Sequence, residues 1–459
     1  MPRLAPDEMT VLGANAQAEA IRDGRITSEE LVSAYLAEVD RREGAVGAWI
    51  HLDRDHALSQ AREADRAHRD GRAQGPLHGV PVGIKDIFDT EDQPTERGSP
   101  IYAGRRPSSD STAVALLRQA GAVIMGKTVT TEFAFYTPGK TRNPHDPQRT
   151  PGGSSSGSAA AVAAGMVPLA IGSQTGGSVI RPASFCGTVG YKPTYGLISR
   201  HGMSPLAPSL DHVGVFARSV EDAALLTETM IAFDEADRTT RPRARPELLR
   251  TALEEPPAAP VLAFARTPAW PEAEADTIAA FEELRATLGS SVVAAELPEV
   301  FNHAIERHSV VMDVEVARSL ANEYRTAPLQ LSEKMRQHIA RGRRLTAQDY
   351  LDAVGIVPRL RAALAEMLET CNAIVTPAAP GQAPRGLDST GNPVFCVIWS
   401  LSGAPAITLP LLKGVDGMPM GVQLIGAPGE DARLLRTARW LARRLAAGSG
   451  PRKSARPAR

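Results

Sequence analysis

The sequence contains little cysteine and no long apolar run. Its three cysteines, Cys186, Cys371 and Cys396, are far apart and show no CxxC spacing, which argues against a disulfide framework and against a zinc site. We expect a reducing, cytoplasmic environment for such a chain. No stretch approaches the roughly 18–20 apolar residues that a membrane-spanning helix needs, and the N-terminal MPRLAPDEMT lacks the apolar core of a signal peptide.

The chain also lacks a strong net charge. The 51 Lys and Arg residues and the 52 Asp and Glu residues leave a formal charge of −1. Such a balance does not favour nucleic acid or a membrane surface as a partner. With 43% hydrophobic and 22% charged residues, the composition is typical of a globular protein. A length of 459 residues is enough for a large core, and α/β enzymes often keep such lengths in one unit.

Hydrophobic periodicity predicts helices that alternate with short buried strands. Helical patterns dominate residues 10–70, and the β-branched segment LHGVPVGIKDIFDT at 77–90 indicates a buried strand. Residues 111–128 read as a helix, a turn and a strand, a unit that builds sheets with helices on their faces. SAAAVAAGM at 158–166 predicts a buried helix of small residues, and VPLAIGSQ at 167–174 predicts another buried strand.

Two glycine-rich and serine-rich segments could carry chemistry. GGSSSGS at 152–158 has the composition of a linker, and it also matches the G-x-S-x-G pattern of a nucleophile elbow. An elbow needs a strand directly before it, and the prolines of NPHDPQRTP exclude a central strand there. The second segment, TGGS at 175–178, can form an anion-binding nest beside a hydroxyl, as acyl transfer requires. An ordinary glycine turn capped by Ser178 is the alternative.

Lysine is scarce, and two of the seven lysines lie in apolar, strand-like segments. These are Lys85 and Lys127. Burial lowers the pKa of a lysine, and a neutral lysine can act as a base. The alternative for Lys85 is an ion pair with Asp86 or a side chain that reaches water from a strand end. A histidine-based triad is a competing chemistry, but neither His201 nor His212 has a decisive spacing from the serines.

The motifs around these residues occur together in one order. GVPVGIKD surrounds Lys85, GGSSSGSAAAVAAG spans 152–165, and GSQTGGSVIRPASFCGTVGYKPTYG spans 172–196. In this combination they resemble the amidase signature family. Further similar segments, such as GAVIMGKTVTTEFAF and GMPMGVQLIGAPGEDARLL, extend the resemblance over roughly residues 10–445.

The resemblance implies a Ser–cis-Ser–Lys triad. Ser178 matches the nucleophile, Ser154 the bridging serine of a cis peptide, and Lys85 the base, with the two serines 24 residues apart, as in the family. Ser155 matches a serine that supports this network. The oxyanion hole is implied to consist of the backbone N–H groups of Thr175, Gly176, Gly177 and Ser178.

The resemblance also implies the fold and the activity. It implies an α/β protein with a large mixed β-sheet core covered by helices on both faces, and a hydrolase of linear amide C–N bonds without a metal or organic cofactor. The implied substrate is a small amide or carbamate (urethane), with aryl amides and esters also open, and a homodimer is the expected assembly. The main alternative is the transamidation (glutaminase) subunit of an aminoacyl-tRNA amidotransferase, to which KPTYGLISRHG and SLDHVG are similar.

We expect a single amidase signature domain over residues 1–447, followed by a basic, disordered tail at 448–459. Within it we expect N-terminal helices at 10–70, a catalytic core at 75–235, a variable helical region at 237–370, and C-terminal strands and a helix at 371–447.

Three positions depart from the family pattern. Many members carry Asp where this chain has Gln174, Arg where it has Ile180, and Asn where it has Ser400. The arginine here is Arg181, one position later. These departures predict that the support of the serine loop is wired differently.

Four aromatic residues are candidates for the substrate pocket, with ordinary core packing as the alternative. They are Phe133, Phe135, Tyr136 and Trp399.

Overall fold

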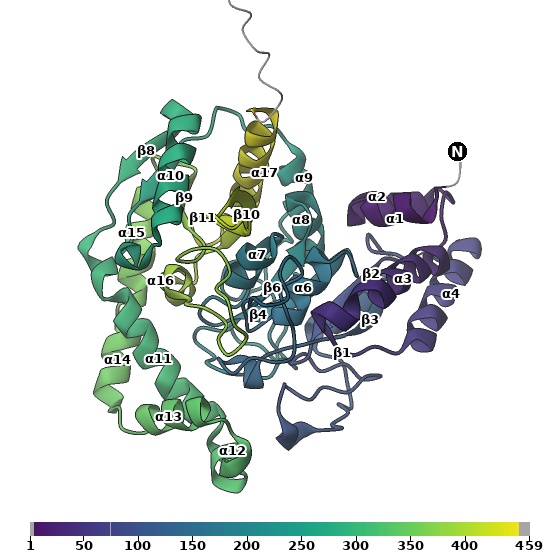
Figure 1. Ribbon diagram of the computed structural model, residues 1–459, viewed down its shortest axis with the longest axis horizontal. Coiled ribbons are helices and arrows are strands. Elements are labelled where there is room, and N and C mark those ends of the chain that lie inside the picture. The colour runs from purple at the N-terminus through teal and green to yellow at the C-terminus, as the bar shows by residue number, and fades with distance from the viewer. Residues whose placement is uncertain (1–3, 74, 449–459) are drawn as a thin grey trace, which may run out of the picture.

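The structure, a computed structural model, describes residues 4–73 and 75–448. The tail predicted from residue 448 onward lies outside these residues, apart from Gly448 at the end of the last helix. The described residues form one mixed sheet of 11 strands, with helices packed around it (Figure 1). The predicted α/β class and the large mixed sheet are therefore confirmed.

The strand order in the sheet is β1-β3-β2-β4-β6-β5-β10-β11-β9-β7-β8. β2 runs parallel to β3 and β4, and β7 runs parallel to β8 and β9, whereas the other neighbours are antiparallel. The strands are β1 (Trp49–His51), β2 (Pro81–Lys85), β3 (Val123–Thr128), β4 (Leu169–Gln174), β5 (Val189–Lys192), β6 (His212–Ala217), β7 (Leu262–Ala265), β8 (Val292–Ala295), β9 (Ala373–Pro377), β10 (Ala406–Lys413) and β11 (Pro419–Ile425).

The N-terminal helices and the helices α10–α15 lie at opposite sides of the molecule in Figure 1. The helices are α1 (Pro6–Val11), α2 (Ala14–Arg22), α3 (Ser28–Val46), α4 (Arg54–Arg69), α5 (Thr112–Gln119), α6 (Ser156–Ala163), α7 (Ile180–Cys186), α8 (Val220–Thr229), α9 (Leu248–Leu253), α10 (Ala275–Leu288), α11 (Ala304–Ser319), α12 (Ala321–Thr326), α13 (Glu333–Gly342), α14 (Ala347–Gly355), α15 (Val357–Met367), α16 (Val394–Ser402) and α17 (Asp431–Gly448).

The centre of the sheet positions the predicted lysine beside the serine segments. All residues of β2 and β4 are buried, as expected for central strands whose two faces are both covered. The two strands are parallel, with Ile84 opposite Ile171. Their carboxyl ends therefore meet at one edge, where β2 ends at Lys85 and β4 ends at Gln174.

The helix of small residues is buried, as the sequence predicts. In α6 every residue from Ser156 to Val162 is buried. A Cβ atom added to Gly157 would lie 2.3 Å from the carbonyl oxygen of Ala48 and from the nitrogen of Val129. Only a glycine permits this close approach of two backbones, which brings the serine loop before α6 against the sheet.

Some predicted boundaries were wrong. The helices expected at 10–70 are interrupted by β1, which pairs with β3, and the strand expected at 77–90 is limited to β2. The helical region 237–370 also supplies β7 and β8. β7 is short, and all its residues are buried. It pairs with β9, which lies more than 100 residues later in the sequence, so local periodicity does not reveal this partner.

Candidate active site

Lys85 lies fully buried at the end of β2. Its Nζ atom donates hydrogen bonds to Ser154 Oγ at 2.7 Å and to Ser173 Oγ at 2.8 Å. Within residues 4–73 and 75–448, no carboxylate forms an ion pair with it. Burial lowers the pKa of Lys85 well below its usual range, and the more distant Asp211 carboxylate opposes this only in part. The structure therefore favours an uncharged amine at this position.

Lys127, the second buried lysine of the sequence analysis, has a different environment. Its Nζ donates to Phe88 O at 2.8 Å and to Thr95 Oγ1 at 2.6 Å, and it lies 3.6 Å from Asp86 Oδ1. The pKa of Lys127 is lowered to about 8, because burial lowers it by more than the nearby Asp86 carboxylate raises it. Asp86 is thus the partner of Lys127 and not of Lys85, so the ion pair considered for Lys85 is absent from the described structure.

The serine-rich loop before α6 carries the hydroxyl that contacts Lys85. The peptide bond between Gly153 and Ser154 is cis, the form that the family resemblance implies. The next residue, Ser155, donates its hydroxyl to Ser173 O at 3.1 Å and accepts a bond from Ser173 N at 3.2 Å. Its backbone N–H also donates to Ser178 O at 3.4 Å. Ser155 therefore fastens the first serine segment to the second.

Ser178 lies between β4 and α7 and lines a small cavity together with Tyr136, Arg181, Met312 and Pro393. Its hydroxyl forms no hydrogen bond with another described residue, so the structure does not show a direct bond from Ser154 to Ser178. Bonds of this kind are often long in a free enzyme and shorten when the substrate binds. Among the described residues, no histidine forms a hydrogen bond with Ser178 or Ser154.

Hydrogen bonds to its carbonyl oxygens hold the loop from Thr175 to Ser178. Thr175 O accepts from His308 Nε2 at 3.0 Å, and Gly176 O accepts from Ser400 Oγ at 2.6 Å. Gly177 O accepts from Arg181 N at 3.0 Å, and Ser178 O accepts from Ser155 N at 3.4 Å. In contrast, none of the four backbone N–H groups of the loop donates a hydrogen bond to another described residue. The donors of this loop are thus free, beside the hydroxyl of Ser178, to bind a ligand oxygen.

Gln174 and Ser400, two of the departures from the family pattern, contact each other. The Gln174 side-chain oxygen accepts bonds from Val179 N and Ile180 N at 2.9 and 3.0 Å. Its Nε2 atom donates to Ser400 Oγ at 3.1 Å, and Ser400 Oγ in turn donates to Gly176 O. The side-chain amide of Gln174 therefore links the start of α7 to α16. Together, Gln174 and Ser400 fix the backbone on both sides of Ser178.

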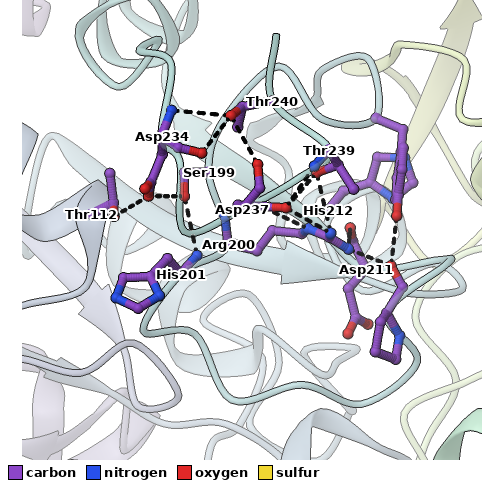
Figure 2. A network of polar contacts seen from close by, with 12 residues as sticks. Thr112, Ser199, Arg200, His201, Asp211, His212, Asp234, Asp237, Thr239 and Thr240 are labelled. Carbon is purple, nitrogen blue, oxygen red and sulfur yellow. Dashed lines mark hydrogen bonds and ion pairs between the residues drawn. The ribbon is translucent and has the colours of Figure 1, made fainter.

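A polar network supports the other side of the loop. The Thr175 hydroxyl donates to Asp211 Oδ1 at 2.6 Å, and burial raises the pKa of Asp211 to about 6. Figure 2 shows Asp211 next to Arg200, whose guanidinium pairs with Asp237 at 3.1 Å. Arg200 Nη1 also donates to Asp211 O at 3.4 Å. The network therefore fixes the segment that carries Asp211, and with it the hydroxyl of Thr175.

The four aromatic candidates separate into two pairs. Phe135 and Tyr136 line the cavity at Ser178. Phe133 contacts the ring of Tyr102 instead, and the fully buried Trp399 packs near Phe301. The free volume of the cavity is only about 10 Å³, room for roughly one water molecule.

Two residues that contact the site were not predicted from the sequence, namely Ser173 and His308. Ser173 lies within the motif that contains Ser178, one residue before the end of β4, and this position could have indicated that it faces Lys85. His308 comes from α11, 133 residues beyond Thr175, and no local pattern pointed to it. Burial lowers the pKa of His308 to about 4, so its ring is neutral and donates to Thr175 O. In the described part of the chain, no cluster of three or more His, Cys, Asp or Glu could hold a metal ion.

The chain is similar to known amidases and amidotransferase subunits in sequence and in structure. The model of the family described as Amidase matches residues 30–435. A glutamyl-tRNA(Gln) amidotransferase subunit of Anaeromyxobacter sp. (strain K) is 35% identical, with 95% of this chain and 97% of that protein covered. The native peptide amidase of Stenotrophomonas maltophilia superimposes with a TM-score of 0.82 at 29% identity, covering 95% and 97% of the two chains. A chain of a vestigial protein complex that reveals the evolutionary origins of an s-triazine catabolic enzyme superimposes with a TM-score of 0.88 at 28% identity. The superposition covers 94% of this chain and 98% of that chain.

Proposed function

The chain belongs to the amidase signature family, and we propose that it hydrolyses linear amide C–N bonds through an acyl-enzyme on Ser178. The observation that carries the proposal is the buried amine of Lys85, whose bonding partners are the hydroxyls of Ser154 and Ser173. A serine hydroxyl is a weak nucleophile until a base removes its proton. A lysine kept neutral by burial can act as that base at ordinary pH.

In this mechanism Ser154 relays a proton between Ser178 and Lys85. A hydroxyl can accept one proton while it donates its own. Ser154 accepts the proton of Ser178 and passes its own to the Nζ atom of Lys85, while Ser178 Oγ bonds to the amide carbonyl carbon. Ser155 and Gln174 support this arrangement, since they fix the two serine segments relative to each other.

The carbonyl oxygen becomes an oxyanion in the tetrahedral intermediate. We assign its binding to the free N–H groups of Thr175, Gly176, Gly177 and Ser178. Donors that are oriented before the reaction stabilise such a charge without reorganisation. The C–N bond then breaks as the proton returns through Ser154 to the leaving amine, and water hydrolyses the acyl-enzyme to a carboxylic acid. These steps use only protein groups and water.

Trapping of the acyl-enzyme tests the proposal. The protein is mixed with a panel of anilides, carbamates, aryl amides and esters, quenched in acid, digested and analysed by mass spectrometry. We expect an acyl group on the peptide that contains Ser178, and none on the Ser178→Ala variant. Retention of near-wild-type hydrolysis by Ser178→Ala would exclude the mechanism. The same panel ranks amides against carbamates and esters, for which the acyl-transfer steps are the same.

A second candidate is a glutaminase subunit of an aminoacyl-tRNA amidotransferase. It is favoured by the 35% identity to the glutamyl-tRNA(Gln) amidotransferase subunit of Anaeromyxobacter sp. (strain K). Gln174 and Ser400, which differ from the family pattern and bond to each other, argue against it. Ammonia release from glutamine, or co-purification with a tRNA-binding partner protein, would support this candidate.

The proposal includes a cytoplasmic location and a homodimer. The location is supported by the three free, buried cysteines, which suit a reducing compartment. Light scattering measures the assembly directly, and a mass of one chain would exclude the dimer. No helix among the described residues is long and apolar enough to cross a membrane.

A further inference from the structure

The cavity beside Ser178 is too small for an amide substrate. Its free volume is about 10 Å³, whereas pockets that bind small molecules usually have ~300–1,000 Å³. The structure therefore shows a closed site. At least one of the segments that line this cavity has to move before a substrate can reach the hydroxyl of Ser178.

One wall of the cavity belongs to a long segment without regular structure. Residues 378–393 connect β9 to α16 and contain no helix or strand. In Figure 1 this segment is the long yellow-green loop beside α16. Its last residue, Pro393, lines the cavity together with Ser178. Loops of such length, longer than ~12–15 residues, are uncommon in compact domains, and many of them are active-site lids.

Two glycines with positive φ lie within the second half of this segment. The φ angle is 95° at Gly386 and 78° at Gly391, and residues with a Cβ atom rarely adopt such values. A Cβ atom added to Gly386 would have no neighbour within 4 Å. Packing therefore does not require a glycine at position 386, whereas the backbone turn does. The two glycines are suitable points for a change of backbone direction.

Both ends of the segment are firmly held. Before Gly386, Arg149 Nη1 donates to Ala383 O at 2.7 Å. Gln382 Nε2 donates to Asp416 Oδ2 at 3.0 Å. After the segment, every residue of α16 from Phe395 to Ser402 is buried. A movement is therefore limited to the residues between these two anchors.

Few bonds from other described residues hold the part between the anchors. Lys334 Nζ donates to Asp388 O at 3.2 Å, and Asn392 Nδ2 donates to Glu272 Oε2 at 3.4 Å, both at the exposed surface. Thr390 is the exception, since it is only 2% exposed. Segments held mainly by exposed hydrogen bonds open locally at a small free-energy cost.

Thr390 fits against the serine loop that carries Ser154. A Cβ atom added to Gly153 would lie 2.6 Å from Thr390 Cγ2, so the two residues are in direct contact. The Thr390 hydroxyl also accepts a hydrogen bond from Arg181 Nη2 at 3.0 Å. The weakly held segment is thus closed over the site by one buried side chain.

We propose that residues 386–393 form a lid over Ser178, and that substrate enters when the lid turns about Gly386 and Gly391. This movement takes Thr390 away from Gly153 and Pro393 away from the cavity. The proposal rests on the amidase function proposed above. Closure after substrate binding excludes bulk water, which strengthens the hydrogen bonds to the oxyanion.

The first test measures opening through the reactivity of a buried thiol. Thr390→Cys is treated with methyl methanethiosulfonate under native conditions, and the modified peptides are quantified by mass spectrometry. Cys186 and Cys396 in the same molecule are fully buried and serve as internal controls. We expect Cys at position 390 to react at least about tenfold faster than either control, because local opening costs less than global unfolding. Equal rates would overturn the lid.

A hinge variant tests the direction of the movement. Gly386→Ala, added to Thr390→Cys, strains the closed backbone without a steric clash. We expect modification to become roughly 5- to 30-fold faster, the factor that corresponds to a residue forced into positive φ. The matched control is Gly417→Ala between β10 and β11, where φ is 76° and an added Cβ atom also has no neighbour within 4 Å. Equal acceleration by both alanines would indicate general destabilisation and refute the hinge.

A reversible cross-link connects the lid to activity. Lys334→Cys and Asp388→Cys are combined, because Lys334 contacts Asp388 in the closed state, and they are joined with a bismaleimide that contains a cleavable disulfide. We expect amide hydrolysis to fall more than about tenfold in the linked protein and to return after reduction, whereas each single variant, treated in the same way, stays active. Full activity of the linked protein would overturn the lid.

The outcomes separate the lid from the amidase function. If the wild type hydrolyses no amide, the amidase function fails, but the thiol rates still decide whether the lid exists. If amides are hydrolysed and the thiol at position 390 stays as protected as Cys186, the lid fails and the amidase function stands. Should Thr390→Cys not fold, the cross-linked protein decides.

Discussion

The Nζ atom of Lys85 lies 2.7 Å from the Oγ atom of Ser154, with a second serine, Ser173, at 2.8 Å. An amine that is fully buried among hydroxyls gains little by being charged, because no anion in the described part of the chain is close enough to compensate the lost hydration. This relationship between Lys85 and Ser154 leads to the first two predictions.

We expect kcat/KM to fall as the pH is lowered through the pKa of Lys85. That pKa is depressed by burial, so the amine is neutral, and able to accept a proton, over a range in which a free lysine is charged. Activity is therefore present above this pKa and lost below it. A pH–rate profile, corrected at each pH for hydrolysis of the substrate without enzyme, measures the effect. Lys85→Met should be inactive at every pH. A wild-type profile that is flat on the acidic side would contradict the assignment.

Ser154→Ala should reduce kcat by about 10²- to 10⁴-fold, the range found for the loss of a proton-transfer group. The matched control is Ser156→Ala at the first residue of α6, two positions after Ser154. The Ser156 hydroxyl makes one long bond, 3.4 Å to Val129 O, so we expect a change of less than about tenfold. Steady-state kinetics on one substrate compare the two variants. Equal losses in both would show that the loop tolerates no alanine, and not that Ser154 relays a proton.

Replacement of Lys127 should mainly lower stability, whereas replacement of Lys85 should mainly lower turnover. Lys127→Met leaves Asp86 buried without its ion-pair partner, which costs roughly 3–5 kcal/mol of unfolding free energy. We expect its kcat to stay close to that of the wild type at temperatures where the variant is folded. Lys85→Met removes only bonds to hydroxyls, so stability should change less while turnover is lost. Urea denaturation and kinetics on both variants check this, and the reverse pattern would assign the base to Lys127.

Gln174→Leu should lower both stability and kcat. The change leaves the backbone N–H groups of Val179 and Ile180 buried without an acceptor, at roughly 1–3 kcal/mol each. Because these residues follow Ser178 directly, we expect kcat to fall more than KM changes. Ser400→Ala, alone and combined with Gln174→Leu, forms a double-mutant cycle, and residues in one network should give non-additive losses. Strictly additive losses would mean that the contact between Gln174 and Ser400 does not matter for the loop.

The sequence predicted those parts of the site that lie in continuous motifs. Lys85, Ser154 and Ser178 are each surrounded by a distinctive local segment, and β2, β4 and α6 are long or uniform enough for periodicity to identify them. What it could not predict are contacts between distant segments. His308 and Ser400 reach Thr175 and Gly176 from α11 and α16, and their side chains have no local signature.

The same limit explains the errors in the fold. β1 and β7 are short, and each is defined by the strand with which it pairs rather than by its own pattern. The aromatic candidates illustrate a further ambiguity. Trp399 and Tyr136 look equally apolar in sequence, but only the structure shows which of them lines the cavity at Ser178.

The scarcity of lysine has a practical consequence for protein chemistry. Three of the described lysines are buried, namely Lys85, Lys127 and Lys192, and the other three are exposed, namely Lys140, Lys334 and Lys413. Reagents that attack side-chain amines therefore meet very few reactive groups on the described surface. Attachment to a solid support, or labelling with a dye, would modify those few positions in the native state and leave the amine at the centre of the sheet untouched.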